Sequence, residues 1–433
     1  MHSRFIERLL VGILLVIFGG IVLHAPISVG FGVLLPDYEL VIKSWKEILM
    51  GLAIMLVLYL AITASKVREI LSDRIMQVIL LYAVIHVACL LFWNGFEASV
   101  AGMFIDLRYI LYFALVYSTL RLYPEYRRLF IGVGFAGAVV VLIFAVLQVF
   151  VLPHDILRYI GYSTQTITPY LTVDLNYDFV RINSTLRGPN PLGAYAGIIL
   201  AIIAAAVVRG KIAPDKKRIG IAIGLAIAAA VALWASYSRS AAGAAIIMVG
   251  IVLVVGLRHL LSRRVWIAGA AVTFALLGGL FAIRDSPFVS NVILHENPNG
   301  GSAEKSNDGH VDSLQDGTAR MVRQPFGAGI GSTGSASLGT DQPLIIENQY
   351  LFIAHETGWI GLTVFIGLFG LILRRLWQRR RDWLALGVFA SGIGLAVIGL
   401  LLPVWVDDTV SIVWWGLAAV ALAGGVYGKR TRK

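Results

Sequence analysis

Long apolar runs recur along the whole chain, and they restrict its possible folds more than any other feature. A helix that crosses a bilayer needs about 20 mostly apolar residues. The stretch 26–36 is short and interrupted by proline and glycine, so we expect a re-entrant or interfacial segment there. The pattern predicts an all-α polytopic membrane protein that forms one membrane domain, residues 1–433. Twelve spanning helices are predicted, near residues 9–24, 47–63, 75–93, 98–120, 129–152, 189–208, 219–235, 240–257, 265–283, 349–373, 384–402 and 411–427.

The composition supports this fold class and excludes several others. Apolar residues make up 58% of the chain and charged residues 14%, whereas about a quarter of the residues in a soluble protein are charged. An ordinary cytosolic enzyme and a disordered chain are therefore excluded. The single cysteine, Cys89, excludes an intramolecular disulfide framework, and we expect it to be a small buried hydrophobic residue.

Lysine and arginine are concentrated in alternate loops. With the N-terminus inside, the seven inner loops hold 25 of the 36 Lys and Arg residues but six of the 25 Asp and Glu residues. Inner loops of membrane proteins carry such an excess, so both termini are predicted to be cytoplasmic. The inner loops sum to +19 and the rest of the chain to −8. The net charge of +11 therefore reflects topology and does not indicate nucleic-acid binding.

Two predicted extracytoplasmic segments, residues 153–188 and 284–346, are much longer than connectors need to be. Loops of this length are usually functional or disordered. The second begins with polar residues rich in Gly and Asn, so we expect a loop or lid there. No internal repeat is visible in the sequence, which weakens the hypothesis of a transporter built from inverted repeats.

Two of the few cations on the outer side precede the predicted helix 189–208. Arg181 and Arg187 lie in the segment RINSTLRGPNPLG, where Asn190 or a neighbour is expected to cap the helix. Backbone N–H groups at a helix start attract anions, so we predict an anion site here. The alternative is that either arginine pairs with Asp174 or Asp178, or with lipid headgroups.

Arg239 occupies a turn of a few residues between two predicted helices, together with Ser236 and Ser238. A charged side chain held so close to hydrocarbon is costly, and this indicates a functional role. The turn is predicted on the same outer side as Arg181. Arginine stays charged in a partly dry site and binds phosphate oxygens with two hydrogen bonds, so Arg239 is a candidate phosphate ligand.

A third polar cluster opens the predicted helix 349–373. Glu347 and Tyr350 are three residues apart and share a helix face, and Asn348 follows Glu347 directly. A carboxylate at the membrane boundary near several arginines is a candidate general base. The alternative is that Glu347 only balances an arginine. Glu356 lies deeper, and we expect it to order the arginines or to form a bond across helices.

Other polar patterns do not indicate a cofactor. Segment 329–334 fits the dinucleotide pattern G-x-G-x-x-G but lacks the strand and helix that the pattern needs. We expect a flexible lid or a backbone anion site there. Asp106 and Arg108 lie deep in the predicted helix 98–120 and do not face each other, so they are expected to pair with other helices or to line a cavity. No metal site is predicted, because the required ligand count and spacing are missing.

The three clusters together resemble the O-antigen ligase/polymerase family, over most of the chain. The resemblance implies a GT-C-like glycosyltransferase of the bacterial cytoplasmic membrane with an extracytoplasmic active site. It also implies an undecaprenyl-diphosphate-linked glycan as donor and metal-independent inversion at the sugar. The matching motifs are Arg181 with Asn190-Pro-Leu-Gly193, the turn Ser236-Tyr-Ser238-Arg239, and Glu347-Asn-Gln-Tyr-Leu351 with Glu356-Thr-Gly358-Trp-Ile-Gly361, in that order.

The resemblance implies that Arg181 and Arg239 bind the donor diphosphate, with Arg187 as a helper. Ligases of the family have a histidine where this chain has Glu347, so Glu347 would replace it as the base. Similar Glu-Asn openings in polymerase-like members favour an O-antigen or exopolysaccharide polymerase with a glycan acceptor. The alternative is a ligase that transfers the glycan to lipid A-core. Supporting positions are Asn190, Ser236, Ser238, Asn348, Tyr350 and Glu356.

Two hypotheses from other classes remain beside this one. A secondary transporter or lipid-linked-glycan flippase predicts ionisable residues near the bilayer midplane, where the sequence places only Asp106 and Arg108. A non-catalytic scaffold in polysaccharide export would tolerate the loss of Glu347.

Overall fold

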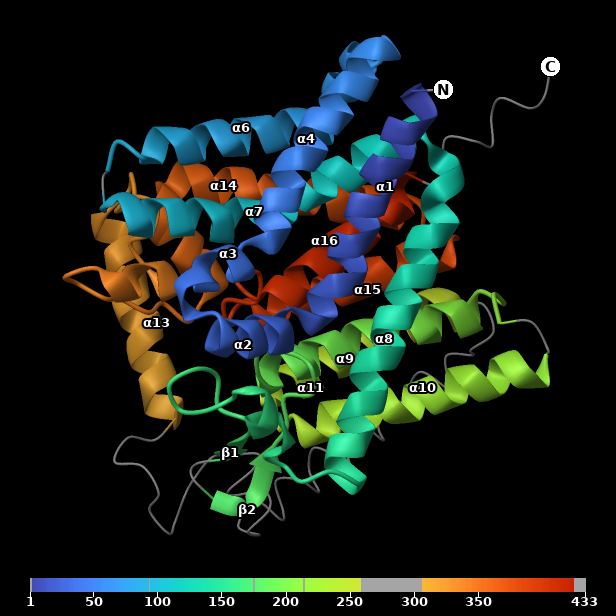
Figure 1. The fold of residues 1–433 in the computed structure, drawn as a ribbon, viewed down its shortest axis with the longest axis vertical. Coiled ribbons are helices and arrows are strands. Elements are labelled where there is room, and N and C mark those ends of the chain that lie inside the picture. Colours follow the sequence, from blue (N-terminus) through green and yellow to red (C-terminus); the bar gives the residue numbers. More distant parts are fainter. Residues whose placement is uncertain (1, 93, 174–175, 213–214, 258–305, 424–433) are drawn as a thin grey trace.

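A computed structural model describes residues 2–92, 94–173, 176–212, 215–257 and 306–423. Within these ranges the chain forms fifteen α-helices and one antiparallel pair of strands (Figure 1). The strands are β1 (Leu171–Val173) and β2 (Asn176–Arg181). The helices are α1 (His2–Gly20), α2 (His24–Leu34), α3 (Glu39–Lys43), α4 (Trp45–Thr63), α5 (Val67–Leu71), α6 (Arg74–Cys89), α7 (Phe96–Leu122), α8 (Arg127–Phe150), α9 (Pro189–Val208), α10 (Lys216–Ala235), α11 (Arg239–Leu257), α13 (Ser306–Arg323), α14 (Gln349–Gln378), α15 (Trp383–Ile398) and α16 (Asp408–Ala423).

Eleven of the twelve predicted spans correspond to apolar helices of the structure, which confirms the all-α polytopic membrane fold. The shorter ones, α6, α15 and α16, have 16 residues each. Such a helix rises about 24 Å, less than the ~30 Å of a bilayer core. The predicted span 265–283 lies outside the described residues. Within the described residues, eight helical segments are long and apolar enough to cross a membrane: Arg4–Leu34, Trp45–Thr63, Phe96–Leu122, Pro124–Phe150, Pro189–Val208, Lys216–Ala235, Arg239–Leu257 and Gln349–Gln378.

The stretch 26–36, predicted as a re-entrant or interfacial segment, is mostly helical. α1 passes through a 3-10 turn, Ile21–Leu23, into α2, which ends at Leu34. Pro26 lies in the first turn of α2, where a missing backbone N–H breaks no helical hydrogen bond. Figure 1 shows α2 lying across the end of α1, with α3 beside it.

The core is built around α16, whose residues from Thr409 to Ala423 are all buried. α16 packs against α7 and α15, and these helices run side by side in Figure 1. Trp414 and Trp415 of α16 meet the ring of Phe369 on α14 at centroid distances of 5.3 and 6.3 Å. Large aromatic side chains bury much apolar area, so this short helix is fixed by packing on all its sides.

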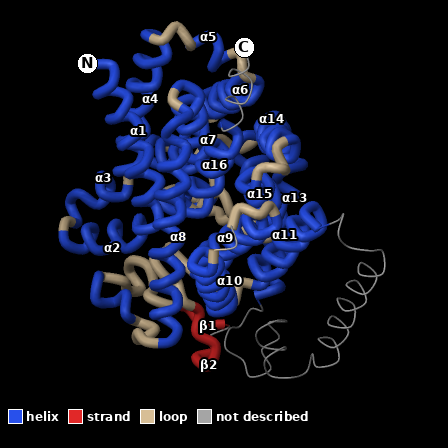
Figure 2. The backbone as a smooth tube through the Cα atoms, turned by 90° about the vertical axis from the view of Figure 1, so that its right-hand side faces the viewer, coloured by secondary structure: helices blue, strands red, loops and turns tan. Residues whose placement is uncertain are grey.

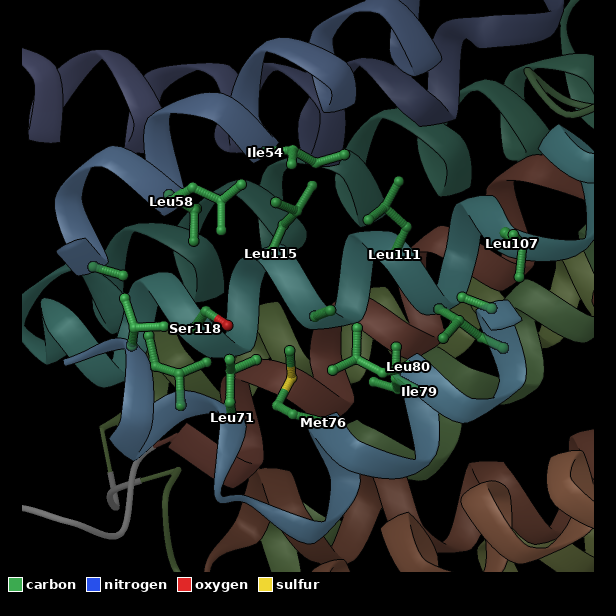
Figure 3. Close-up of a pocket in the computed structure, with 17 residues that line it drawn as sticks. Ile54, Leu58, Leu71, Met76, Ile79, Leu80, Leu107, Leu111, Leu115 and Ser118 are labelled. Carbon is green, nitrogen blue, oxygen red and sulfur yellow. The ribbon is translucent and has the colours of Figure 1, made fainter. Parts of the chain in front are cut away.

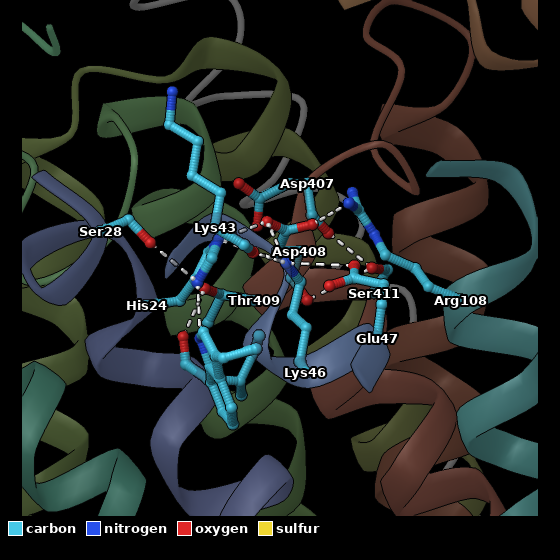
Figure 4. Close-up of polar contacts among 12 residues, drawn as sticks. His24, Ser28, Lys43, Lys46, Glu47, Arg108, Asp407, Asp408, Thr409 and Ser411 are labelled. Atoms are coloured by element: carbon cyan, nitrogen blue, oxygen red, sulfur yellow. Dashed lines mark hydrogen bonds and ion pairs between the residues drawn. The ribbon is translucent and has the colours of Figure 1, made fainter. Parts of the chain in front are cut away.

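An ion cluster around Asp408 joins the starts of α2, α4 and α16 to the middle of α7 (Figure 4). Asp408, the first residue of α16, pairs with Arg108 of α7. Its Oδ2 lies 2.9 Å from His24 Nε2 of α2 and 3.5 Å from Lys46 Nζ of α4. Lys46 also pairs with Glu47 at 3.1 Å. The prediction that Arg108 pairs with another helix is therefore confirmed, while Lys46 and Asp408 were not predicted to take part.

A second charged junction lies at the C-terminal end of α7. Asp73 caps α6, since its Oδ1 accepts the N–H of Ile75 at 2.9 Å. Arg375 of α14 and Arg121 of α7 pair with the same carboxylate at 2.8 and 2.9 Å. Burial raises the pKa of Asp73, but the bonds and charge of Arg375 outweigh it and hold the pKa below its ordinary value. The contribution of these pairs to the free energy of unfolding is therefore present at neutral pH. It is lost as the pH falls through the lowered pKa of Asp73.

Replacement of Asp408 with Asn should destabilise the whole helix bundle. It removes the carboxylate that pairs with Arg108, and an unpaired buried charge costs about 3–5 kcal/mol. Thermal unfolding of the purified protein in detergent measures the loss. The matched control is Asp155→Asn, which removes an exposed pair with Arg158 and should cost at most about 1 kcal/mol. Equal unfolding temperatures for the two variants would contradict the structural role of Asp408.

Candidate functional site

Arg181, the last residue of β2, connects two helices. Its Nε donates to the backbone oxygen of Ser236 at the end of α10 (2.9 Å), and a terminal nitrogen donates to Asn190 Oδ1 in the first turn of α9 (2.7 Å). The N–H of Ile182 donates to the backbone oxygen of Ala235 (3.1 Å). β2 therefore fixes the guanidinium between α9 and α10, and it brings two of the predicted motifs together.

Asn190 does not cap α9. Gly188 is the N-cap residue and makes no side-chain cap bond, and the helix begins at Pro189. Asn190 lies within the first turn, and its side chain accepts the hydrogen bond from Arg181 instead. Asn190 therefore contacts Arg181, and the neighbouring Gly188 occupies the cap position of the helix.

The turn that carries Arg239 packs closely on Gly193 of α9. Ser236 and Ser238 are both buried, and Ser238 N–H donates to Ser236 Oγ at 3.2 Å. Tyr237 between them has a φ of +46°. A Cβ on Gly193 would lie 2.7 Å from Ser236 Oγ and 3.2 Å from Ser238 Cβ, so a larger residue would displace the turn. The two serines thus shape the turn that places Arg239, half-buried, at the first position of α11.

Arg187 lies between this region and the ion cluster of Asp408. Its side chain is exposed, unlike those of the five residues before it. Burial raises the pKa of Asp407, and the positive charges of Arg187 and Arg108 oppose that rise. Because Asp407 directly precedes Asp408, the ion cluster extends to the neighbourhood of Arg187.

Asn348 begins α14 and attaches it to α15. Its side-chain oxygen accepts the N–H groups of Tyr350 and Leu351 at 2.9 and 3.0 Å. Its amide donates to the backbone oxygen of Leu400 at 2.7 Å, and the Tyr350 hydroxyl donates to that of Ala396 at 2.9 Å. Both residues, predicted as supporting positions, therefore fix the start of α14 rigidly on the end of α15.

Glu347 precedes this cap and lies beside α13. Its side chain is half-buried, and its backbone N–H donates to Ser313 Oγ of α13 at 3.2 Å. α13 packs against α14. The described part of the predicted lid 284–346, residues 306–346, is thus in contact with the bundle, while residues 284–305 lie outside the described ranges.

The directions of the helices show where these motifs lie relative to one another. Gly256 of α11 packs on Val208 of α9, so these two helices run parallel from their first residues to their last. Gly387, near the start of α15, packs on Ile202, near the end of α9. α15 is therefore antiparallel to α9, and its last residues lie at the end where α9 and α11 begin.

We call this end of the bundle the hairpin end, because β1 and β2 lie there (Figure 2). Met248, in the middle of α11, contacts glycines in the middle of both α9 and α15. From the level of Met248, each of the three helices continues for about 8–14 Å toward the hairpin end, at a rise of 1.5 Å per residue. These lengths of helix end at Asn190, Arg239 and Gly399. Asn348 bonds to the residue after Gly399. The structure thus brings all three predicted motifs to one end of the bundle.

Glu356 is enclosed by the glycine-rich segment 329–334. Its Oε1 accepts the N–H groups of Gly331 at 3.1 Å and Thr333 at 3.4 Å, and the residue is 1% exposed. Gly331 has a φ of +80°, and a Cβ there would lie 2.1 Å from the backbone oxygen of Ala98. Backbone N–H groups of the segment therefore bind a carboxyl group of the protein itself. Of the two roles expected for Glu356, the structure favours a bond across helices, since its carboxyl interacts with that of Asp106 on α7 and its bonds to backbone N–H groups in the described structure go to this segment.

Sequence reasoning missed the surroundings of Glu356. The carboxyl of Asp106 on α7 lies close enough to act on that of Glu356. Asp106 Oδ2 is 3.6 Å from Nε2 of His86, which is fully buried on α6. His86 Nδ1 donates to the backbone oxygen of Tyr82 at 2.9 Å. Asp106 therefore does meet other helices, as predicted, but no spacing in the sequence links His86 to Glu356.

The arrangement suits binding of an anion at the hairpin end. Arg181 bonds to the backbone of Ser236, and Arg239 follows that turn as the first residue of α11. Arg187 follows Arg181 on the same segment, and Glu347 precedes the start of α14. Fixed cations stabilise charge that develops on a leaving group. Among the described residues, no group of three or more His, Cys, Asp or Glu residues is placed to hold a metal ion.

A comparison with known protein families finds a matching family model. Residues 223–366 match the model of the O-antigen ligase family, and no curated protein matches the chain. The matched segment is about one third of the chain and contains the Ser236–Arg239 turn and the Glu347 and Glu356 motifs. Arg181 and Asn190 precede it. The match of residues 223–366 supports the assignment of this chain, a multi-pass membrane protein, to the O-antigen ligase/polymerase family of membrane glycosyltransferases.

Proposed function

We propose that this protein transfers a glycan from a polyprenyl diphosphate, such as undecaprenyl diphosphate, to an acceptor hydroxyl, with inversion and without a metal ion. One observation carries the proposal: the cations of two motifs and the carboxylate of a third lie at the same end of the bundle. A lipid-linked donor fits this location, because its diphosphate lies at the membrane boundary while its chain stays in hydrocarbon.

In the proposed reaction, Arg181 and Arg239 bind the donor diphosphate. The acceptor oxygen forms a bond to the anomeric carbon while the bond from that carbon to the diphosphate oxygen breaks. The electron pair of the broken bond stays on the diphosphate, where fixed cations stabilise it. The acceptor proton moves to Glu347, which acts as the general base. Arg181 is well placed for this role, since two hydrogen bonds already fix its guanidinium.

We place the hairpin end on the extracytoplasmic side of the bacterial cytoplasmic membrane. The support is the charge asymmetry of the loops, which predicts cytoplasmic termini. The basic connection between α4 and α6 lies at the opposite end from β1 and β2 (Figure 2). A polymerase acting on a glycan acceptor is our first choice, and a ligase acting on lipid A-core is the second.

The transporter hypothesis gains one observation, because Lys46, His86, Glu356 and Asp408 join Asp106 and Arg108 as ionisable residues inside the bundle. These groups face one another or backbone N–H groups. The family match favours transfer chemistry, since it covers the Arg239 and Glu347 motifs.

Substitution of Arg181 or Arg239 by Ala should each lower kcat/KM for transfer about 10²–10³-fold, the usual effect of removing one stabilising group from a developing anion. The measurement uses purified protein and a lipid-linked glycan, with thermal unfolding to verify the fold. The matched control is Arg158→Ala, an exposed arginine that pairs with Asp155. Full activity of both site variants would refute the proposed diphosphate site.

Glu347→Gln should lower kcat about 10²–10⁴-fold with little change in donor affinity, because a general base acts on the acceptor proton. Glu347→Asp should retain part of the activity. Asp341→Asn, an exposed acid of the same segment, is the control. A normal rate for Glu347→Gln would contradict its role as the general base and would favour a scaffold or transporter.

Incubation with a lipid-linked repeat unit, with and without lipid A-core, distinguishes the two enzyme activities. We expect a ladder of glycan lengths without the core, because a polymerase uses a second glycan as acceptor. Gel analysis of the released glycans reads out the ladder. Product that forms only with the core would identify a ligase instead.

A further inference from the structure

An apolar cavity lies between α4, α5, α6 and α7 (Figure 3). It has a volume of about 290 Å³ and is lined by residues of α4, α5, α6 and α7, of which only Ser118 is polar. At its rim, Leu58, Leu71 and Leu80 are 52%, 43% and 47% exposed. The cavity therefore opens sideways to the surroundings of the helices, which for a spanning bundle are lipid.

The cavity is long in the direction of α7. Its lining on this helix extends from Leu107 to Ser118, a rise of about 16 Å. The hydrocarbon of one leaflet is about 15 Å deep, half of a ~30 Å core. An acyl chain of one leaflet therefore matches the cavity in length and in polarity.

The mouth of the cavity carries positive charge. Lys66, Arg68 and Arg74 lie in the connection between α4 and α6, whose residues Val67 and Leu71 line the cavity. Arg68 and Arg74 are exposed, and neither pairs with an acid among the described residues. Basic residues close to a membrane surface bind anionic headgroups.

The two acids of this connection are occupied by other partners. Arg121 pairs with Glu69 at 3.3 Å and with Asp73 at 2.9 Å. Arg375 pairs with Asp73 at 2.8 Å. Lys66 reaches Glu69 only at 3.8 Å. The two acids are balanced by Arg121 and Arg375. The three cations of the connection therefore leave a net charge of +3 at the mouth of the cavity.

We propose that this cavity binds one anionic phospholipid, with an acyl chain between α4, α6 and α7 and its headgroup at Arg68 and Arg74. The lipid belongs to the leaflet that faces the α4–α6 connection, which is the cytoplasmic leaflet in the topology proposed above. Its site is separate from the donor site at the hairpin end. The tail of the donor lipid is the competing occupant, and it would enter with its diphosphate at the other face.

The test is native mass spectrometry of the purified protein with added phosphatidylglycerol or phosphatidylcholine. We expect one phosphatidylglycerol to bind and to raise the unfolding temperature, and phosphatidylcholine to bind at least tenfold more weakly. The double variant Arg68→Gln/Arg74→Gln should weaken phosphatidylglycerol binding about 30-fold. The matched control, Lys217→Gln/Arg218→Gln, removes the same charge from the exposed start of α10 and should leave binding unchanged.

A second pair of variants tests the cavity itself. Ala83→Phe places a ring in the cavity, because Ala83 is one of its lining residues. Val84→Phe adds the same ring on a side chain that is 63% exposed and does not line the cavity. We expect the first variant to lose the bound lipid and the second to keep it, with both eluting as folded protein in size-exclusion chromatography.

Three outcomes would overturn the proposal. Equal loss in both charge variants would show that binding is diffuse electrostatics. Retention of the lipid by Ala83→Phe would place it outside the cavity. Displacement of phosphatidylglycerol by undecaprenyl diphosphate, one for one, would make the donor tail the occupant. None of these outcomes depends on transfer activity, so failure here leaves the proposed glycosyltransferase function standing.

Discussion

The bundle depends on the pairing of charges inside apolar surroundings. An isolated charge there costs several kcal/mol, and removing one partner of a buried pair exposes that full cost. Asp408 meets this requirement for Arg108 and Lys46, and by doing so it fixes where α2, α4, α7 and α16 meet. The hydrophobic effect does not select one rotation of a uniformly apolar helix in lipid, so these few polar contacts and the packing of small residues decide it.

Glycine supplies the second constraint, because it lets backbones approach where polar groups must meet. Gly193 leaves room for the Ser236 turn, which holds one hydrogen bond of Arg181. Gly331 adopts a positive φ against α7 and turns its N–H toward Glu356. A side chain at either position would separate elements that the site requires in contact. The family motifs thus combine residues that are proposed to bind the donor or move a proton with glycines that allow the backbones to come close together.

The two ends of the bundle differ in what they attract. The hairpin end holds a few arginines against a net negative background, together with a half-buried carboxylate. The opposite end holds the basic connections and an apolar cavity as deep as one leaflet. This separation suits a protein that binds a lipid-linked substrate at one membrane face and binds lipids of the opposite leaflet at the other face.

The sequence by itself determined the position of most helices, because a bilayer demands about 20 apolar residues in a row. The distribution of Lys and Arg predicts which side each loop faces. The sequence also singled out Arg181, Arg239 and Glu347, since charges beside hydrocarbon are rare. The sequence could not reveal the β-hairpin that delivers Arg181, the bonds of Asn190, or the partners of Glu356, His86 and Asp408. Some of those contacts join residues that are hundreds of positions apart in the sequence. Apolar helices of similar composition also do not reveal which helix packs against which. Only the tertiary structure decided these contacts, because a buried polar group takes its partner from whichever element packing brings within hydrogen-bond distance.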